Sequence, residues 1–267
     1  MAEPPLTGRR VRTIANRLPN LERRRGVVFT VVTGGYDVLR QPAVLDREHF
    51  DYVCLTDRHL LRRLHKSTVW RELRFIGGGG SSQRLARLAK IHPHVFFPSY
   101  EWSIFVDANI VIRGDLMEVI RRMEGDVALF RHPRRGCVYE EAEACIRLGK
   151  DSPEVIEAQM NRYREQRYPP GMGLVASYLL VRRHNEEPVQ QLMTAWWEEL
   201  RKGSRRDQLS FDYCVWKLGQ SYVSIAEDLG ISQSSLIDIR PHMRCRSFRQ
   251  ILRLDRRRRK QAPGDRA

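Results

Sequence analysis

The feature that most constrains the fold is residues 102–115, which read WSIFVDANIVIRGD. The first five of these residues are apolar and rich in β-branched and aromatic side chains, which predicts a short buried strand. Asp107 ends this run, and Asn109 follows on the same side of an extended chain, because side-chain direction has a period of two. Open α/β sheets bind ligands beyond the carboxyl ends of their strands, so Asp107 and Asn109 are candidate ligand-binding residues.

Oxygen donors at this position suit a divalent cation, Mn2+ or Mg2+, that holds a diphosphate. The alternative is an ordinary strand-to-turn junction, in which Asp107 and Asn109 serve the turn itself. Near the end of the chain, His242 is a candidate third ligand, because a neutral imidazole nitrogen commonly binds metal. Most isolated histidines are not ligands, and short motifs of this kind often match by chance.

Alternating strand and helix signals between residues 27 and 225 predict an α/β fold in a chain long enough for one full core. Apolar runs predict strands at 27–32, 51–56, 74–76, 102–106, 126–130, 173–182 and 222–225. Helical spacing and start signals predict helices over 57–65, 82–92, 115–123, 152–168, 188–200 and 207–218. We expect one domain with a central mixed, mostly parallel sheet flanked by helices.

The formal net charge of +15 is concentrated at the two ends of the chain. Residues 1–26 carry seven Arg against two acidic residues, and residues 251–267 carry seven basic against two acidic residues. The two ends therefore contribute +10, and residues 27–250 contribute the remaining +5. This division predicts a basic N-terminal arm (1–26), a catalytic domain (27–250) and a basic C-terminal tail (251–267).

Basic ends of this kind are typical of segments that contact an anionic membrane surface or another polyanion. The alternative is a disordered end that only increases solubility. The charge also raises the possibility of a nucleic-acid-binding or nucleotidyl-transferring protein. We expect no specific nucleic-acid partner, because RNP, zinc-finger and recognition-helix patterns are absent between the two ends.

Five cysteines without a CxxC pair argue against a disulfide framework or a zinc cage and favour a reducing compartment. The sequence has no apolar stretch approaching the roughly 18 residues of a membrane span and no hydrophobic core of a signal peptide. We therefore expect a cytoplasmic protein, peripheral at the inner face of the membrane if its basic ends bind there.

Two further strand ends carry candidate donor-binding residues. Thr33, Gly34 and Tyr36 follow the strand at 27–32, where paired glycines allow close approach of a ligand and Tyr36 can stack on a planar base. The alternative is a simple strand-to-helix turn with Tyr36 in the core. Asp57 follows the strand at 51–56 and can accept the imide N–H of uracil, or it caps the helix that follows.

Basic residues recur on the helix that precedes the strand at 102–106. Arg84, Arg87 and Lys90 are spaced three apart. Helical cations normally face solvent, but the position of Arg87 and Lys90 directly before the candidate metal site favours a diphosphate partner.

The loop after the strand at 126–130 holds candidate acceptor-binding residues. His132, Arg134, Arg135, Glu140 and Glu141 lie close together in sequence and are candidates for contacts with an acceptor substrate, with Glu140 also a candidate base. Acidic residues near a helix start also stabilise the helix dipole, which is the alternative. Asp207, before the last predicted helix, is well suited to capping that helix.

Seven segments, taken in order, resemble the glycosyltransferase-like domain family that links bacterial proteins with plant seed-mucilage proteins. The resemblance covers about residues 27–220, and its His-Pro, Arg-Arg-His-Asn and Arg-Asp-Gln-Leu-Ser-Phe blocks are specific to the family. It implies a GT-A fold, the Rossmann-like single domain of nucleotide-sugar transferases. The segments are VVTGGYD, YVCLTD, LARLAKIHPHVFF, WSIFVDANI, ALFRHPRRGCVYEEAEACI, GLVASYLLVRRHN and SRRDQLSFDYCVWK.

More distantly, the chain is similar to glycosyltransferase family 8, the glycogenin-like retaining enzymes. The similarity implies that Asp107 and Asn109 occupy the metal-binding DxD positions, with His242 as the late metal histidine. It also implies that Asp57 lies near the base, Lys90 near the phosphates, and Asp207 and Gln208 at the pair that contacts the donor sugar. The residues around His242 differ from the family pattern, and Asn109 replaces an Asp, so metal affinity depends more on the diphosphate.

The expected function is transfer of a sugar from a nucleotide-sugar, above all a UDP-sugar, to a hydroxyl of a glycan or lipid-linked acceptor. The cation with Lys90 or Arg87 would stabilise the departing diphosphate. An inverting reaction needs a carboxylate base, Asp207 or Glu140, whereas a retaining one does not, and the sequence does not decide between them. A non-catalytic nucleotide- or glycan-binding module is a further alternative, favoured by the altered DxD.

Overall fold

The computed structural model describes residues 26–34, 37–56, 69–74 and 82–242. Within these residues a seven-stranded sheet has the order β3-β2-β1-β4-β7-β6-β8. Only β7 runs antiparallel to its neighbours β4 and β6, and the other pairs are parallel. The expected α/β fold with a mixed, mostly parallel sheet is confirmed. The strands are β1 (Gly26–Val32), β2 (Phe50–Thr56), β3 (Arg71–Arg74), β4 (Trp102–Val106), β6 (Val127–Arg131), β7 (Val175–Arg182) and β8 (Val223–Ser224).

Strand β1 shows why the sequences of the central strands are continuously apolar. Val27 and Phe29 pack into one buried cluster, whereas Val28 and Val32 pack into another. Successive side chains of a strand point to opposite faces, so both faces of the sheet are covered.

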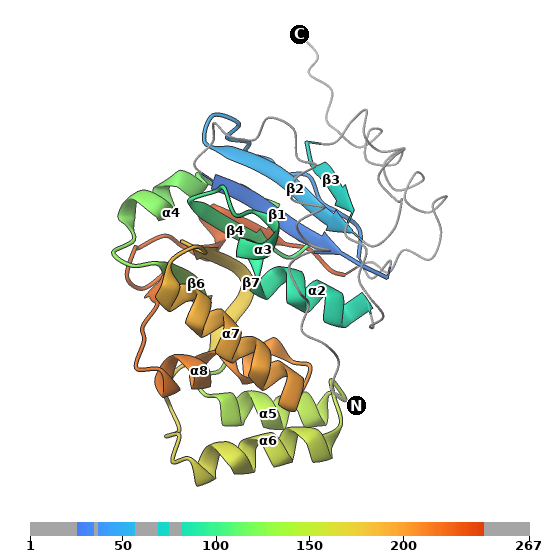
Figure 1. Ribbon diagram of the computed structural model, residues 1–267, viewed down its shortest axis with the longest axis vertical. Helices are drawn as coiled ribbons and strands as arrows, with labels where there is room; N and C mark the ends of the chain where they lie inside the picture. Colours follow the sequence, from blue (N-terminus) through green and yellow to red (C-terminus); the bar gives the residue numbers. More distant parts are fainter. Residues whose placement is uncertain (1–25, 35–36, 57–68, 75–81, 243–267) are drawn as a thin grey trace.

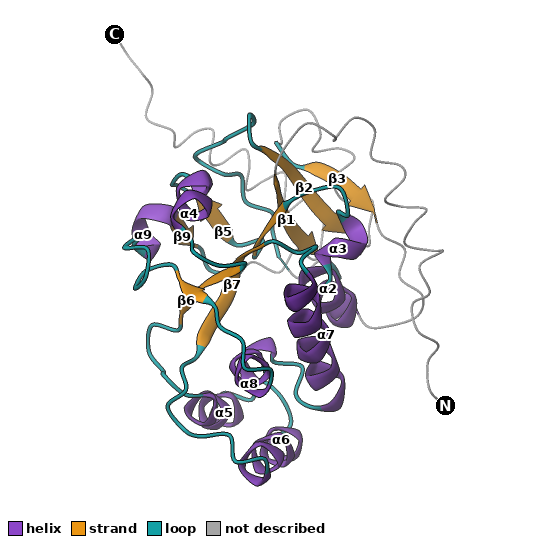
Figure 2. Cartoon of the chain, turned by 60° about the vertical axis from the view of Figure 1, so that its left-hand side comes forward, coloured by secondary structure: helices purple, strands orange, loops and turns teal. Residues whose placement is uncertain are grey.

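The first cluster lies between the sheet and a layer of helices (Figures 1 and 2). Trp196 and Tyr163 are among its largest buried side chains, so Trp196 belongs to the core. The spacing of apolar residues predicted most of these helices. They are α2 (Ser82–Ile91), α3 (Pro93–Phe96), α5 (Val138–Arg147), α6 (Pro153–Glu165), α7 (Glu187–Lys202) and α8 (Phe211–Lys217).

The second cluster is covered by α4 (Leu116–Arg122), α9 (Gln233–Leu236) and a two-stranded sheet. That sheet pairs β5 (Ile110–Ile112) antiparallel with β9 (Ile237–Ile239). The sequence did not predict it, because three-residue strands carry little periodicity and their partners lie far apart in the chain. Its consequence is that the segment leading to His242 returns beside the residues that follow Asp107.

Several predicted boundaries differ from the structure. The short strand expected at 74–76 is β3, three residues earlier, and residues 75 and 76 lie outside the described residues, as does the helix expected at 57–65. The Asp115 side chain accepts from Met117 N at 2.7 Å, but Glu118 pairs with Arg122 instead of completing a capping box. The helix expected at 207–218 is divided into a short 3-10 helix, η1 (Asp207–Leu209), and α8.

The Arg-Arg-His-Asn block at the end of β7 fixes the helix that carries Lys90. Arg182 is fully buried and donates to the backbone oxygens of Lys90 and Ile91. His184 Nε2 contacts Phe97 O at 2.8 Å, and Asn185 Nδ2 donates to Pro98 O at 3.0 Å. These bonds satisfy backbone oxygens where α2 and α3 end, so this block is structural.

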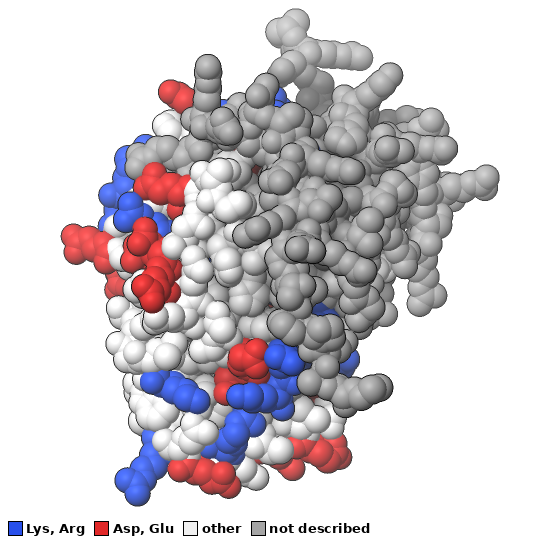
Figure 3. Space-filling view, viewed as in Figure 1, with Lys and Arg blue, Asp and Glu red and all other residues white. Residues whose placement is uncertain are grey.

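Charged residues of both signs are interspersed on the face seen in Figure 3. None of the helices in the described ranges is long and apolar enough to cross a membrane. The predicted arm (1–26, apart from Gly26) and tail (251–267) lie outside the described residues.

Candidate donor-binding site

The centre of the site is a buried carboxylate, Asp207 at the start of η1. Its Oδ2 accepts from Lys90 Nζ at 2.5 Å, Arg87 Nη1 at 2.8 Å and Ser177 Oγ at 3.0 Å. Ser177 Oγ also accepts from Lys90 Nζ at 2.9 Å. The interpretation of Asp207 as a helix cap is wrong, because its carboxylate binds side chains from α2 and β7 rather than the backbone of η1.

Lys90 is 2% exposed, so this helical cation does not face solvent. Its ammonium lies 4.8 Å from the centre of the Phe105 ring. Burial alone would raise the pKa of Asp207, but Arg87 and Lys90 outweigh it and hold this pKa well below its usual range. Burial lowers the pKa of Lys90, and Asp207 opposes that shift. Asp207 is therefore an ionised carboxylate in an ion pair with almost no access to water.

Asp107 lies at the end of β4 and faces the same cluster. Burial raises its pKa, while the charges of Lys90 and Arg87 partly offset that rise, and Asp207 and His242 have smaller effects. Asp107 therefore lies near enough to both predicted phosphate-binding cations and to Asp207 for their charges to shift its pKa. Its backbone N–H donates to Tyr178 O at 2.9 Å, which fixes the end of β4 against β7.

Asn109 is clamped to the C-terminal segment. Its Nδ2 donates to Arg240 O at 2.7 Å, and Arg240 N donates back to Asn109 O at 3.0 Å. These two bonds continue the pairing of β5 with β9. The Oδ1 atom of Asn109 is buried and makes no hydrogen bond within the part of the chain that the structure describes. A buried acceptor without a donor is costly, and a cation or a ligand donor would satisfy it.

His242 follows β9 and is held by Asp37, with 2.5 Å between His242 Nδ1 and Asp37 Oδ2. A carboxylate on one ring nitrogen directs the other nitrogen's lone pair outward, which is the usual arrangement of a metal-binding histidine. Among the described residues no three His, Cys, Asp or Glu side chains form a metal-holding group. A cation bound by Asp107 and His242 would therefore also depend on the Asn109 amide oxygen and on ligand oxygens, which suits a hard divalent ion.

Gln208 is fixed at both ends of its amide. Arg206 Nη2 donates to Gln208 Oε1 at 3.1 Å, and Gln208 Nε2 donates to Val175 O at 3.2 Å. Burial opposes the charge of Arg206, but Asp207 and the neighbouring Cys145 and Glu141 outweigh it and raise the Arg206 pKa. Arg206 thus lies between the buried Asp207 and α5, the helix that follows the loop after β6.

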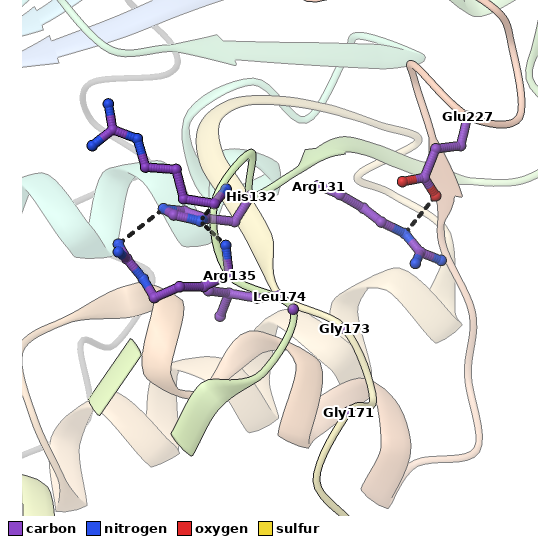
Figure 4. Close-up of a pocket in the computed structure, with 9 residues that line it drawn as sticks. Arg131, His132, Arg135, Gly171, Gly173, Leu174 and Glu227 are labelled. Atoms are coloured by element: carbon purple, nitrogen blue, oxygen red, sulfur yellow. Dashed lines mark hydrogen bonds and ion pairs between the residues drawn. The ribbon is translucent and has the colours of Figure 1, made fainter. Parts of the chain in front are cut away.

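That loop forms part of a pocket of about 380 Å³ (Figure 4). The predicted acceptor residues His132 and Arg134 both line it. Glu141 does not: it is 3% exposed, and it binds Arg135 Nε. Glu140 is exposed and accepts from Gly136 N at 3.3 Å.

The remaining predicted donor residues are only partly described. Thr33 and Gly34 lie directly after β1, and Gly34 has a φ of +63°, a conformation that glycine adopts readily. Tyr36 and Asp57 lie outside the described residues, so the base-binding predictions for them stay predictions.

Three residues of this region were not predicted as contacts of the site: Asp37, Ser177 and Arg206. Arg206 had a signal in the sequence, because it directly precedes Asp207 and Gln208. Ser177 had none, because its role depends on α2 packing beside β7, a relationship between residues 87 positions apart.

The sequence profile of the TOD1/MUCI70 glycosyltransferase-like domain family matches residues 7–229. The chain belongs to this family. The resemblance inferred from the sequence blocks is thereby confirmed.

Two plant members of the TOD1/MUCI70 family are similar to the chain. The probable hexosyltransferase MUCI70 of Arabidopsis thaliana is 25% identical over 142 residues, which cover 48% of this chain and 24% of the relative. The alkaline ceramidase TOD1 of Arabidopsis thaliana is 26% identical over 220 residues, which cover 70% of this chain and 47% of the relative. The chain thus spans less than half the length of either.

Among solved structures, the apo bifunctional glycosyltransferase WbbM is similar to this TOD1/MUCI70 member, with a TM-score of 0.45 and 14% identity. The match covers 77% of this chain and 39% of that one.

Proposed function

We propose that the protein transfers a sugar from a nucleotide-sugar, most directly a UDP-sugar, to an acceptor hydroxyl. The observation that carries this proposal is the convergence of Asp107, Lys90, Arg87 and Asp207 beyond the carboxyl end of β4. An open α/β sheet binds its ligands at this end. Two cations beside a candidate metal carboxylate are the groups that a diphosphate requires.

A divalent cation, Mn2+ or Mg2+, would be held by Asp107, the Asn109 amide oxygen and His242. When bound, it would neutralise charge on the diphosphate leaving group. Asp37 would keep the His242 ring in the binding orientation. The raised pKa of Asp107 supports this assignment, because a carboxylate whose charge is not fully compensated gains from a nearby cation.

Lys90 and Arg87, held in place by Asp207, would stabilise the negative charge that develops on the diphosphate. Asp207 and Gln208 would contact the donor sugar. The lowered pKa of Asp207 makes it a weak base, which favours an orienting role over proton abstraction. For an inverting reaction, the exposed Glu140 is then the remaining candidate base.

The acceptor is proposed as a glycan or lipid-linked hydroxyl. One relative is named a hexosyltransferase and the other a ceramidase, so amide hydrolysis of a sphingolipid is a competing activity to test directly. The basic arm and tail are proposed to bring a cytoplasmic enzyme to an anionic membrane. We propose no specific nucleic-acid partner.

Thermal unfolding with a panel of nucleotide-sugars, with and without Mn2+, tests donor binding, because a ligand that binds only the folded state raises its melting temperature. We expect a UDP-sugar with Mn2+ to stabilise the wild type. Asp107→Ala should lose this effect, whereas the surface control Asp126→Ala should keep it.

Donor binding without turnover would instead indicate a binding module. Hydrolysis of a short-chain ceramide with no stabilisation by any nucleotide-sugar would contradict the transferase proposal.

A further inference from the structure

The pocket beside the loop after β6 has one wall in common with the candidate donor site. Gly173 and Leu174 line the pocket, and the next residue, Val175, accepts the hydrogen bond from Gln208. His132 N also donates to Leu174 O at 2.7 Å, so the two walls are joined by the backbone. The pocket therefore adjoins the backbone segment to which Gln208 is bound.

The lining of the pocket is polar. Of the nine residues that line it, Leu174 alone has a large apolar side chain. An acyl chain placed there would leave buried polar groups without hydrogen bonds, which costs roughly 1–3 kcal/mol for each group. The lining does not suit a lipid chain.

The charges around the pocket are largely balanced. Arg131 Nε lies 2.8 Å from Glu227 Oε2, and Arg135 pairs with Glu141 (Figure 4 shows the first pair). Glu140 adds a further carboxylate at Gly136 N. An anionic ligand would meet the Glu227 carboxylate among arginines of which two are already paired, with Glu140 beside the lining residue Gly136, so the charges give it little net attraction.

His132 adds a neutral polar group. Its Nδ1 accepts from the backbone N–H groups of Arg134 at 3.3 Å and Arg135 at 3.1 Å. Burial and the charge of Arg135 lower the His132 pKa, which favours the neutral ring. Its Nε2 lies 3.1 Å from Arg135 Nη2, which can only donate, so this nitrogen is not a free donor toward the pocket.

We propose that this pocket is the acceptor subsite and binds an uncharged saccharide unit. Each sugar hydroxyl both donates and accepts, so it can bridge an arginine and a carboxylate of the same ion pair. The proposal rests on the proposed function for the identity of the site, but it predicts ligand binding that requires neither donor nor metal.

Saturation-transfer NMR with four soluble probes tests the proposal. The probes are the methyl glycosides of glucose, galactose and N-acetylglucosamine, together with methyl glucuronoside as the charged counterpart. Gly136→Trp fills the pocket: a Cβ at Gly136 meets no atom within 4 Å, and the position has no left-handed φ. Arg134→Ala removes one lining guanidinium, and Arg201→Ala on the surface of α7 is its matched control.

We expect at least one neutral glycoside to bind more tightly than the glucuronoside. Its affinity should fall about tenfold in Arg134→Ala, as for the loss of one hydrogen bond to a charged group, and remain unchanged in Arg201→Ala. Gly136→Trp should abolish the signal while retaining cooperative unfolding. The proposal is overturned if no neutral glycoside binds, if Gly136→Trp leaves binding intact, or if the glucuronoside binds more tightly. Failure of nucleotide-sugar binding with glycoside binding intact would contradict the proposed function alone.

Discussion

Arg206 donates from Nη2 to Oε1 of Gln208 at 3.1 Å, and this bond determines which end of the Gln208 amide faces Val175. The same arginine lies near the buried Asp207 and near Glu141, which anchors a lining residue of the pocket. It thus connects the two halves of the proposed site.

Arg206→Ala should lower kcat about tenfold or more with a smaller change in donor KM, because the Gln208 amide is then free to rotate. Arg206→Lys should restore only part of the rate, since an ammonium cannot reproduce the planar fork. Steady-state transfer kinetics measure both variants. A higher KM for the donor with an unchanged kcat would show instead that Arg206 only helps to bind substrate.

Lys90→Met should destabilise the fold by about 3 kcal/mol or more, because Asp207 is left buried with one of its two ion-pair partners removed. The double variant Lys90→Met with Asp207→Asn should recover part of that loss. Urea unfolding of the single and double variants provides the comparison. A loss below about 1 kcal/mol in Lys90→Met would mean that water reaches this pair.

Asp37→Asn should weaken Mn2+ binding about 10- to 100-fold, as expected for loss of the carboxylate that orients a metal-binding histidine. Titration of free Mn2+ by electron paramagnetic resonance, in the presence of UDP, measures the affinity. Asp46→Asn is the matched control, since Asp46 pairs with His49 Nδ1 at 2.8 Å in the same chemical arrangement away from Asp107. An equal loss of Mn2+ affinity in both variants would contradict the assignment of His242 as a metal ligand.

Stability should fall on acidification between about pH 6.5 and pH 4. Burial lowers the pKa of His184 to about 4, against its ordinary value of 6.5. In that window the unfolded chain binds a proton that the folded protein does not, so stability rises with pH and is lost as pH falls. The shifted pKa of His184 contributes about 3 kcal/mol to the free energy of unfolding. Urea unfolding at pH 7 and pH 4.5 should show a smaller difference in His184→Gln, and an unchanged difference would contradict the assignment.

The sequence predicted the sheet because its central strands are buried on both faces and therefore have continuous apolar sequences. It placed Asp107, Lys90 and Asp207 in one site through their resemblance to a family, and the structure brings these three side chains together. It did not predict that Lys90 and Asp207 bind each other in this structure, because helical periodicity does not reveal contacts between distant elements. Glu141 was assigned to the acceptor, but its burial against Arg135 makes it a supporting residue.

The same limit explains the small sheet. The local sequence of residues 237–239 does not predict a strand. The pairing of β9 with β5 nevertheless places His242 near Asp107. Contacts of this kind depend on the path of the whole chain.

The most direct test of the central claim is release of UDP from UDP-sugars by the wild type and by Asp107→Ala, with Mn2+ and with EDTA. The account predicts Mn2+-dependent release by the wild type that EDTA stops. It also predicts at least about a hundredfold lower rate in Asp107→Ala with an unchanged unfolding transition. Equal rates in the two proteins would contradict the assignment of Asp107 to the reaction.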